Sequence, residues 1–218
     1  MKLVLASQGF MTKEIVDSVV DLVQKPKDEI KISIINEAYV GLAENKDKHW
    51  LIKELSLIEK NFNGIIDFVN LRAYEIEEIE KRLKNTDIIY IVGGKQFLLA
   101  KLFKETGFDS LLKELSKEKV IMGTSAGSIV LGKPVDSNEY YLDRYKINKE
   151  DIEVHNLGFV DFNIIPHYLR EDRLNYNEEY YKKVLKDNTF KIYAINDNQA
   201  IIYNNGEINF IGGEPVIF

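Results

Sequence analysis

Residues 120–130 read VIMGTSAGSIV, an apolar run that ends in Gly-x-Ser-x-Gly and resumes at once. This pattern is typical of a strand that turns sharply into a helix, with one serine at the apex. Gly123 and Gly127 lack the side chains that would clash in so tight a turn. The Ser125 hydroxyl would project away from the backbone, and the first N–H groups of the following helix would favour negative charge beside it. The stretch therefore predicts a nucleophilic serine.

The motif alone also fits ordinary packing at a strand-to-helix turn, so its context matters. Apolar runs that suit strands alternate with amphipathic stretches that suit helices. Strands are expected at 3–6, 30–35, 65–69, 88–92, 120–122, 162–165 and 192–195, and shorter ones at 200–203, 207–211 and 216–218. This alternation predicts an α/β fold, with a doubly wound, mostly parallel sheet and helices on both faces. No linker or repeat interrupts it, so we expect residues 1–218 to form a single domain.

Composition excludes several classes of protein. A net charge of −6 argues against a nucleic-acid binder, which would usually present a basic face. No apolar run approaches the roughly 20 residues needed to span a membrane. With no cysteine there is no disulfide, thiolate nucleophile or cysteine metal site. The N-terminus reads as a first strand rather than a signal peptide, so we expect a cytoplasmic protein.

A serine nucleophile needs a base, and the chain has only three histidines. His49 stands at a predicted helix start, where a solvated or capping role is expected. His155 belongs to a polar segment, 134–155, that resembles an insertion or lid. His167 follows a predicted strand whose carboxyl end would lie near Ser125, where ligands of such sheets collect. It is the expected general base, although it could also be a structural polar residue. The three histidines show no paired ligand spacing, so we expect no metal.

Asp197 is the candidate that would orient this histidine. It follows the strand predicted at 192–195, which places it at the same sheet edge, although Asp-Asn is also ordinary turn chemistry. The chain order would then be Ser, His, Asp. The α/β-hydrolases, which share the elbow, use Ser, Asp, His, so the order argues against an ordinary esterase.

Five segments together resemble the dipeptidase E (aspartyl dipeptidase) family of serine peptidases, which includes the cyanophycinases. They are the Ser7 loop and residues 90–97, 123–128, 157–168 and 195–201, in family order. The combination of Gly-x-Ser-Ala-Gly with a strand ending in Pro-His-Tyr is specific. The resemblance implies a fold similar to the class I glutamine amidotransferase domain, a flavodoxin-like sheet in which serine replaces the usual cysteine.

The resemblance also implies roles for individual residues. Ser125 matches the nucleophile and His167 the general base. The backbone N–H groups of Gly94 and Ala126 match the oxyanion hole, which stabilises the tetrahedral oxyanion. Asp197 falls where family members carry Glu, Asp or occasionally a neutral residue.

Two departures from the family pattern bear on the substrate. Lys95 replaces the usual Asn after Gly-Gly, and it could either hold a substrate carboxylate or be solvated. In aspartate-specific members an arginine after the base pairs with the acidic side chain of the substrate. Arg173 is the preferred match and Arg170 the second, since a planar guanidinium suits a carboxylate. The segment is short here, so specificity for an N-terminal Asp stays open.

These inferences predict a serine exopeptidase that hydrolyses dipeptides or short peptides, with N-terminal Asp as one candidate, through an acyl-enzyme on Ser125. No metal or organic cofactor is expected. The expected partner is a small peptide substrate, with no nucleic acid and no membrane, and the chain would be a monomer or homodimer. The alternatives are a cyanophycinase-like hydrolase, an esterase, or a weakly catalytic protein that binds a peptide or metabolite.

Overall fold

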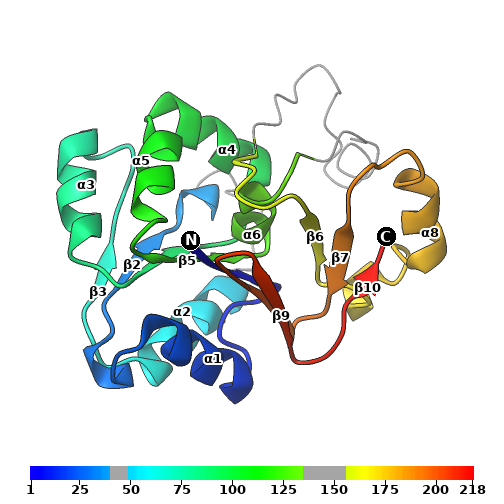
Figure 1. The fold of residues 1–218 in the computed structure, drawn as a ribbon, viewed down its shortest axis with the longest axis horizontal. Helices are drawn as coiled ribbons and strands as arrows, with labels where there is room; N and C mark the ends of the chain where they lie inside the picture. The colour runs from blue at the N-terminus through cyan, green and yellow to red at the C-terminus, as the bar shows by residue number, and fades with distance from the viewer. Residues whose placement is uncertain (40–48, 135–155) are drawn as a thin grey trace.

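The fold is built on two sheets, seen in a computed structural model that describes residues 1–39, 49–134 and 156–218. The larger sheet has seven strands in the order β3-β2-β4-β5-β1-β8-β9, and the smaller has three in the order β10-β7-β6 (Figure 1). The strands are β1 (Lys2–Ala6), β2 (Ile32–Ile35), β3 (Ile66–Phe68), β4 (Ile88–Ile91), β5 (Val120–Thr124), β6 (Asn163–Pro166), β7 (Ile192–Ile195), β8 (Ala200–Asn204), β9 (Glu207–Ile211) and β10 (Val216–Ile217). The α-helices are α1 (Lys13–Val23), α2 (His49–Asn61), α3 (Ile76–Lys84), α4 (Gln96–Glu105), α5 (Phe108–Leu115), α6 (Ala126–Leu131) and α8 (Glu178–Val184).

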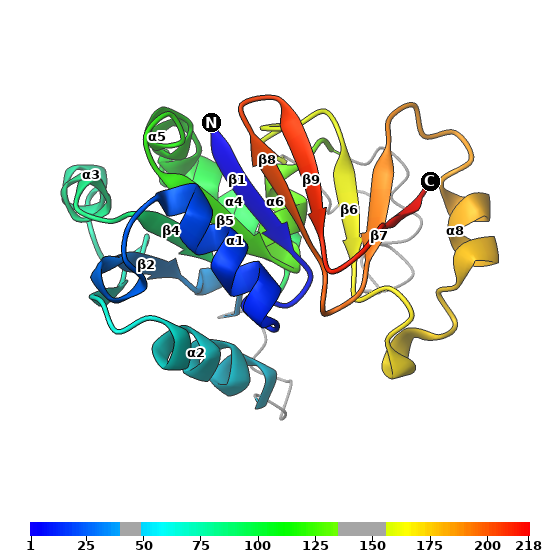
Figure 2. The same ribbon diagram turned by 60° about the horizontal axis from the view of Figure 1, so that its bottom comes forward.

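The five strands from β1 to β5 are mutually parallel, while β8 and β9 add an antiparallel hairpin beyond β1. Successive residues of the buried strands face opposite layers, as the period of two requires. Leu3 and Leu5 pack with α3, α4, α5 and α6, whereas Val4 and Ala6 pack with α1 and α2. Figure 2 shows these helices on the two faces of the sheet. The predicted α/β fold with both faces covered is confirmed.

The division into two sheets was not predicted. β6 and β7 pair in parallel, and β10 joins β7 antiparallel, but none of the three joins the larger sheet. Ile164 and Tyr193 of the small sheet nevertheless belong to the same buried cluster as Leu3 and Leu5 of the large one. Alternating strands and helices give the order of the elements, but they do not show which sheet each strand joins. Residues 135–155, which make up nearly all of the predicted lid and include His155, lie outside the described residues.

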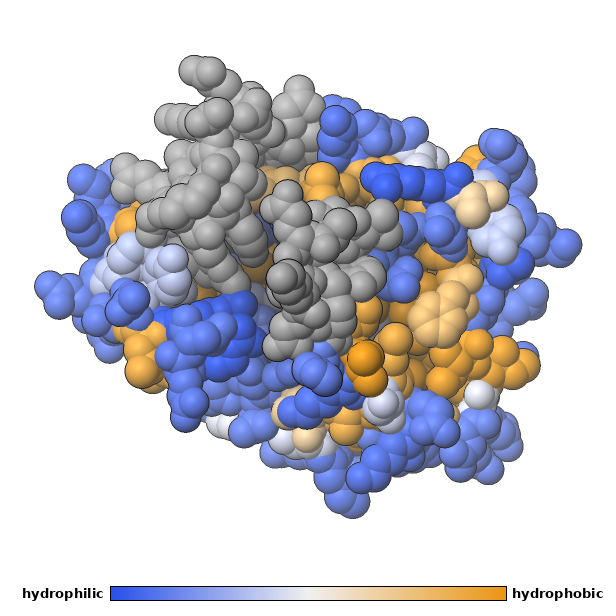
Figure 3. All heavy atoms as spheres, turned by 180° about the vertical axis from the view of Figure 1, so that it is seen from behind, coloured by the Kyte–Doolittle hydropathy of each residue, from blue (hydrophilic) through white to orange (hydrophobic). Residues whose placement is uncertain are grey.

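β3 forms one edge of the large sheet and exposes both apolar and charged side chains. Ile65, just before the strand, is 62% exposed and Phe68 is 49% exposed. Between them, Asp67 pairs with Arg82 of α3 at 3.1 Å. A charge on an edge strand discourages pairing with another chain. Figure 3 shows a similar mixture of apolar and hydrophilic side chains on the face seen from behind. None of the helices in the described ranges is long and apolar enough to cross a bilayer.

A buried carboxyl group joins α2 to the ends of two central strands. Glu54 is 3% exposed, and its Oε1 accepts hydrogen bonds from the Tyr90 hydroxyl and from Thr124 Oγ1, both at 2.7 Å. Burial raises the pKa of Glu54 above its ordinary value of 4.5, although the two hydrogen bonds oppose this. Burial likewise raises the pKa of Tyr90 well above 10.0. The folded protein therefore holds the Glu54 proton more tightly than the unfolded chain does, and it does so beside Thr124, directly before the Ser125 turn.

We expect Glu54→Gln to stabilise the protein at neutral and alkaline pH. Because the pKa is raised in the folded state, the folded state retains a proton that the unfolded chain releases above about pH 4.5, so the stability contributed by Glu54 declines as pH rises. Glutamine keeps an acceptor oxygen and does not ionise. The melting temperature of the variant should exceed that of the parent at pH 8, by a margin that shrinks toward pH 4.5.

Glu59→Gln, on the exposed face of the same helix, is the matched control and should show no such pH-dependent margin. A Glu54→Gln variant that melts below the parent by the same amount at pH 5 and pH 8 would contradict a neutral buried acid.

Candidate active site

Ser125 occupies the apex of the turn between β5 and α6. Its φ of 50° and ψ of −114° lie in a region that side-chain-bearing residues rarely adopt. The turn is so tight that a Cβ on Gly123 would stand 2.4 Å from the carbonyl oxygen of Gly127, and one on Gly127 would stand 2.1 Å from that of Ile91. Both glycines are therefore required by close backbone contacts. The Ser125 N–H donates to the carbonyl of Ala6 at 3.0 Å, which ties the turn to β1.

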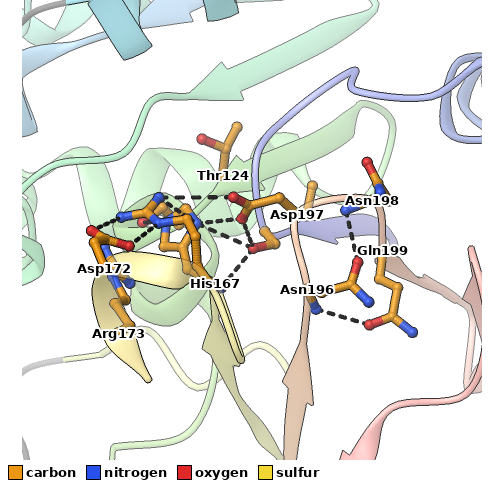
Figure 4. A network of polar contacts seen from close by, with 12 residues as sticks. Thr124, His167, Asp172, Arg173, Asn196, Asp197, Asn198 and Gln199 are labelled. Carbon is orange, nitrogen blue, oxygen red and sulfur yellow. Dashed lines mark hydrogen bonds and ion pairs between the residues drawn. The ribbon is translucent and has the colours of Figure 1, made fainter. Parts of the chain in front are cut away.

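The structure brings Ser125, His167 and Asp197 into one hydrogen-bonded series. His167 Nε2 lies 2.9 Å from Ser125 Oγ, and His167 Nδ1 lies 2.5 Å from Asp197 Oδ1 (Figure 4). His167 directly follows β6, and Asp197 stands in the turn after β7. With the Nδ1 proton directed at Asp197, the lone pair of Nε2 is available to accept the Ser125 hydroxyl proton. The arrangement suits a serine nucleophile with an oriented base.

Burial is the main reason why His167 favours its neutral form. Burial and, to a smaller extent, the positive charges of Arg173 and Arg170 lower the pKa of His167 from 6.5 to about 4, against the opposing hydrogen bond and charge of Asp197. For Asp197, burial raises the pKa, but the hydrogen bonds from His167 and Ser7 and the nearby positive charges outweigh it, so the net shift is downward. The pair therefore consists of a neutral imidazole and an ionised carboxylate near neutral pH.

Ser7, directly after β1, contacts both members of this pair. It is fully buried, its hydroxyl donates to Asp197 Oδ1 at 2.8 Å, and its Oγ accepts the backbone N–H of His167 at 2.7 Å. The Ser7 loop is one of the five segments of the family resemblance, but the sequence assigned the serine itself no role. Its position at the carboxyl end of a buried strand was the available signal.

Hydrogen bonds within its own turn fix the position of Asp197. Gln199 Oε1 accepts the N–H of Asn196 at 2.8 Å, and Asn196 Oδ1 accepts the N–H of Asn198 at 2.9 Å. The Gln199 amide also donates to the carbonyls of Gly213 and Glu214 at 3.1 and 3.2 Å. These bonds are drawn in part in Figure 4. Asp197 is thus held from behind by the segment that leads to β10.

The Gly93-Gly94 turn lies directly against the nucleophile. A Cβ on Gly93 would stand 2.9 Å from Ser125 Cβ and 3.5 Å from its Oγ, and Gly94 has a φ of 147°. The N–H of Lys95 donates to the carbonyl of Ala38 at 3.1 Å, and that of Ser125 is taken by Ala6. The N–H groups of Gly94 and Ala126 remain the predicted oxyanion donors. The Gly93-Gly94 turn and the start of α6, which carry them, both lie next to Ser125.

The three predicted substrate-binding residues differ in their surroundings. Arg170 Nε and Nη2 lie 2.6 and 2.8 Å from the two carboxylate oxygens of Asp172, and its Nη1 lies 3.8 Å from Asp197 Oδ2 and 3.2 Å from His167 Nδ1. Arg173 has a side chain that is 15% exposed, with its Nε 3.9 Å from Asp172 Oδ2. Lys95 is the N-cap residue of α4 and is partly exposed.

The other sequence expectations concern histidines and metals. His49 begins α2 and is exposed. Within the residues that the structure describes, no group of three or more His, Cys, Asp or Glu side chains is arranged to hold a metal ion.

Similar sequences and folds are found among known peptidases. The sequence profile of Peptidase family S51 matches residues 3–211. An uncharacterized peptidase of Listeria monocytogenes is 28% identical over 150 residues, which are 66% of this chain and 69% of that protein. An uncharacterized peptidase of Pasteurella multocida is 29% identical over 147 residues, 65% of this chain and 68% of its own.

Two solved structures share the fold. A candidate peptidase E protein from Listeria monocytogenes EGD-e superposes with a TM-score of 0.75 at 22% identity, covering 96% of each chain. A peptidase from an acI-B1 Actinobacterium gives a TM-score of 0.70 at 17% identity, covering 97% of this chain and 87% of that one.

The low pKa of His167 predicts how Ser125 reactivity depends on pH. The rate of labelling by a fluorophosphonate should be nearly constant above about pH 6 and should fall about tenfold per unit below about pH 4, as His167 becomes protonated. Arg173→Ala removes a nearby positive charge, so it should raise the pKa and move the midpoint to higher pH. Arg72→Ala, which removes an exposed charge elsewhere, should leave the midpoint unchanged. A parent midpoint near 6.5 would contradict the buried, neutral imidazole.

Proposed function

The chain belongs to peptidase family S51, and on that premise we propose that it is a serine exopeptidase acting on dipeptides or short peptides through an acyl-enzyme on Ser125. The observation that supports this best is the pair of contacts from His167, one at 2.9 Å to Ser125 Oγ and one at 2.5 Å to Asp197 Oδ1. Nucleophile, base and orienting carboxylate are what acyl transfer requires of a serine enzyme.

In the proposed reaction His167 Nε2 takes the hydroxyl proton as Ser125 Oγ attacks the peptide carbonyl. The developing imidazolium is balanced by the ionised Asp197, and the oxyanion would be bound by the N–H groups of Gly94 and Ala126. Each such donor typically lowers the barrier by roughly 3 kcal/mol. The imidazolium then gives its proton to the leaving amine, and water attacks the ester by the same route to release the acid and restore Ser125.

The surroundings of the two arginines favour Arg173 over Arg170 as the residue that binds a substrate carboxylate. The Arg170 guanidinium already contacts both oxygens of Asp172 and lies near Asp197, so a substrate would have to displace internal partners. Arg173 lies close enough to His167 to lower its pKa, which places its charge near the reacting groups. Lys95, next to the predicted oxyanion donor Gly94, is the other candidate. The positive charges of Arg173 and Lys95 favour a substrate with an acidic residue at its N-terminus.

Loss of the nucleophile or the base should remove nearly all activity. We expect Ser125→Ala and His167→Ala each to lower kcat for dipeptide hydrolysis by on the order of 10⁴- to 10⁶-fold, and Asp197→Asn by about 10⁴-fold. His49→Ala, at an exposed histidine that is not among the proposed site residues, should retain parent activity. A fluorophosphonate adduct should map to the peptide that contains Ser125. An adduct on another serine, or near-parent hydrolysis by both alanine variants, would refute the mechanism.

The proposed preference for acidic substrates predicts a selective effect of Arg173→Ala. Measured at pH 8, where His167 is neutral with or without the arginine, kcat/KM for Asp-X dipeptides should fall roughly 10- to 100-fold, since a hydrogen-bonded charge pair is lost. Turnover of Ala-X dipeptides should not fall and should rise slightly, because loss of the Arg173 charge makes His167 a stronger base. Lys95→Ala is the matched test of the other cation. Parent turnover of β-aspartyl peptides or acyl esters without Asp-X turnover would favour the cyanophycinase-like or esterase alternatives, and tight binding without turnover would favour a binding protein.

A further inference from the structure

The nucleophile and its base belong to different sheets. Ser125 follows β5 of the seven-stranded sheet, whereas His167 and Asp197 follow β6 and β7 of the three-stranded sheet. No strand pairing joins β6 or β7 to the large sheet among the described residues. The 2.9 Å contact between Ser125 and His167 therefore depends on how one sheet docks against the other.

The dipeptide Ala6-Ser7 spans this junction. Strands β1 and β5 pair so that Ala6 lies opposite Thr124. Ser7 and Ser125 are therefore the first residues after two neighbouring strands. The Ala6 carbonyl accepts the N–H of Ser125 at 3.0 Å. One residue later, the Ser7 side chain turns to the small sheet, where it donates to Asp197 and accepts the N–H of His167. The Ser7 N–H also donates to the Gln199 carbonyl at 3.3 Å.

Ser7 Oγ makes two short hydrogen bonds, which act on different features of the site, and a longer contact of 3.4 Å to His167 Nδ1. Its hydroxyl donates a hydrogen bond to Asp197 Oδ1, the oxygen that also accepts the hydrogen bond from the His167 ring N–H. This second bond fixes the rotation of the Asp197 carboxylate. Its lone pair holds the backbone of His167, whose φ is 60°. A non-glycine residue in that region persists only where its surroundings stabilise it. The same oxygen thus sets both the backbone of the base and the direction of its acceptor.

We propose that Ser7 is a positioning residue for the proposed peptidase reaction, which fixes His167 and Asp197 of the small sheet relative to Ser125 of the large sheet. It does not touch the reacting atoms and acts through the two residues that it holds. The inference rests on the proposed function, because it assumes that His167 serves as the base for Ser125.

A buried hydroxyl outside the site is available for comparison. Ser116, the C-cap residue of α5, is 4% exposed, and its Oγ donates to the Lys113 carbonyl at 2.7 Å. It precedes β5, whereas Ser125 follows the other end of that strand. Ser7→Ala and Ser116→Ala each delete one buried hydroxyl, and only the first removes bonds to His167 and Asp197.

The test compares these variants by fluorophosphonate labelling and by dipeptide hydrolysis at pH 8. We expect Ser7→Ala to lower the labelling rate and kcat by about 10- to 100-fold, as the loss of a hydrogen bond to a charged group implies, with KM changed by less than about threefold. Ser116→Ala should label at the parent rate even if its melting temperature falls as much as that of Ser7→Ala. Ser7→Cys, which keeps the size and a weaker donor, should give an intermediate rate and covers the case in which the alanine variant does not fold.

A double-mutant cycle separates positioning from general loosening of the fold. In an Asp197→Asn background, Ser7→Ala should lower the labelling rate by a smaller factor than it does in the parent, because part of its effect passes through Asp197. The inference would be overturned by an equal fold-loss from Ser7→Ala in the two backgrounds, by an equal loss in Ser116→Ala, or by Ser7→Ala labelling within twofold of the parent. Failure of the parent itself to label at Ser125 would instead refute the proposed function, so the two outcomes are distinguishable.

Discussion

The docking of the three-stranded sheet against the seven-stranded sheet is the constraint on which the site depends. The turn at Ser125 is formed by the large sheet and its helix α6, but the base His167 and its carboxylate partner Asp197 follow strands of the small sheet. A shared apolar cluster holds the sheets together, yet apolar packing is non-directional and does not by itself align a hydroxyl with an imidazole. Hydrogen bonds are directional, and those of the Ser7 side chain cross the junction where alignment is needed, while the Ala6 carbonyl holds Ser125 within the large sheet.

The same contacts sustain unusual backbone at both ends of the Ser125–His167 bond. Ser125 has a φ of 50° and His167 a φ of 60°, conformations that cost of order 1–3 kcal/mol each. The Ser125 backbone is held by Ala6 and by the first turn of α6, where Ser128 and Ile129 donate to its carbonyl at 3.0 Å. The His167 backbone is held by Ser7. Backbone strain and side-chain alignment therefore share one set of supports, which is typical of preorganised sites.

Sequence patterns predicted those parts of the site that local chemistry determines. Ser125 followed from a glycine-flanked turn between apolar runs, and His167 from its place after a strand. The separation into two sheets could not be predicted, because strand pairing depends on tertiary contacts that periodicity does not encode. For the same reason nothing in the sequence distinguished Ser7 from other polar residues at strand ends. Nor could spacing alone show that Asp172 engages Arg170, since that contact depends on side-chain direction in a short 3₁₀ segment.

The charges around His167 connect substrate preference to base strength. A pKa of about 4 keeps the imidazole neutral but also makes it a weak base, and Arg173 contributes to that low value. If Arg173 binds a substrate carboxylate, as proposed, the bound charge offsets the charge of the arginine and raises the pKa of His167. A stronger base activates the serine more effectively. An acidic peptide would then increase the basicity of the group that cleaves it, while a neutral peptide would meet the weaker base. Selectivity would arise partly in kcat, because the charge that recognises the substrate also sets the proton affinity of the imidazole.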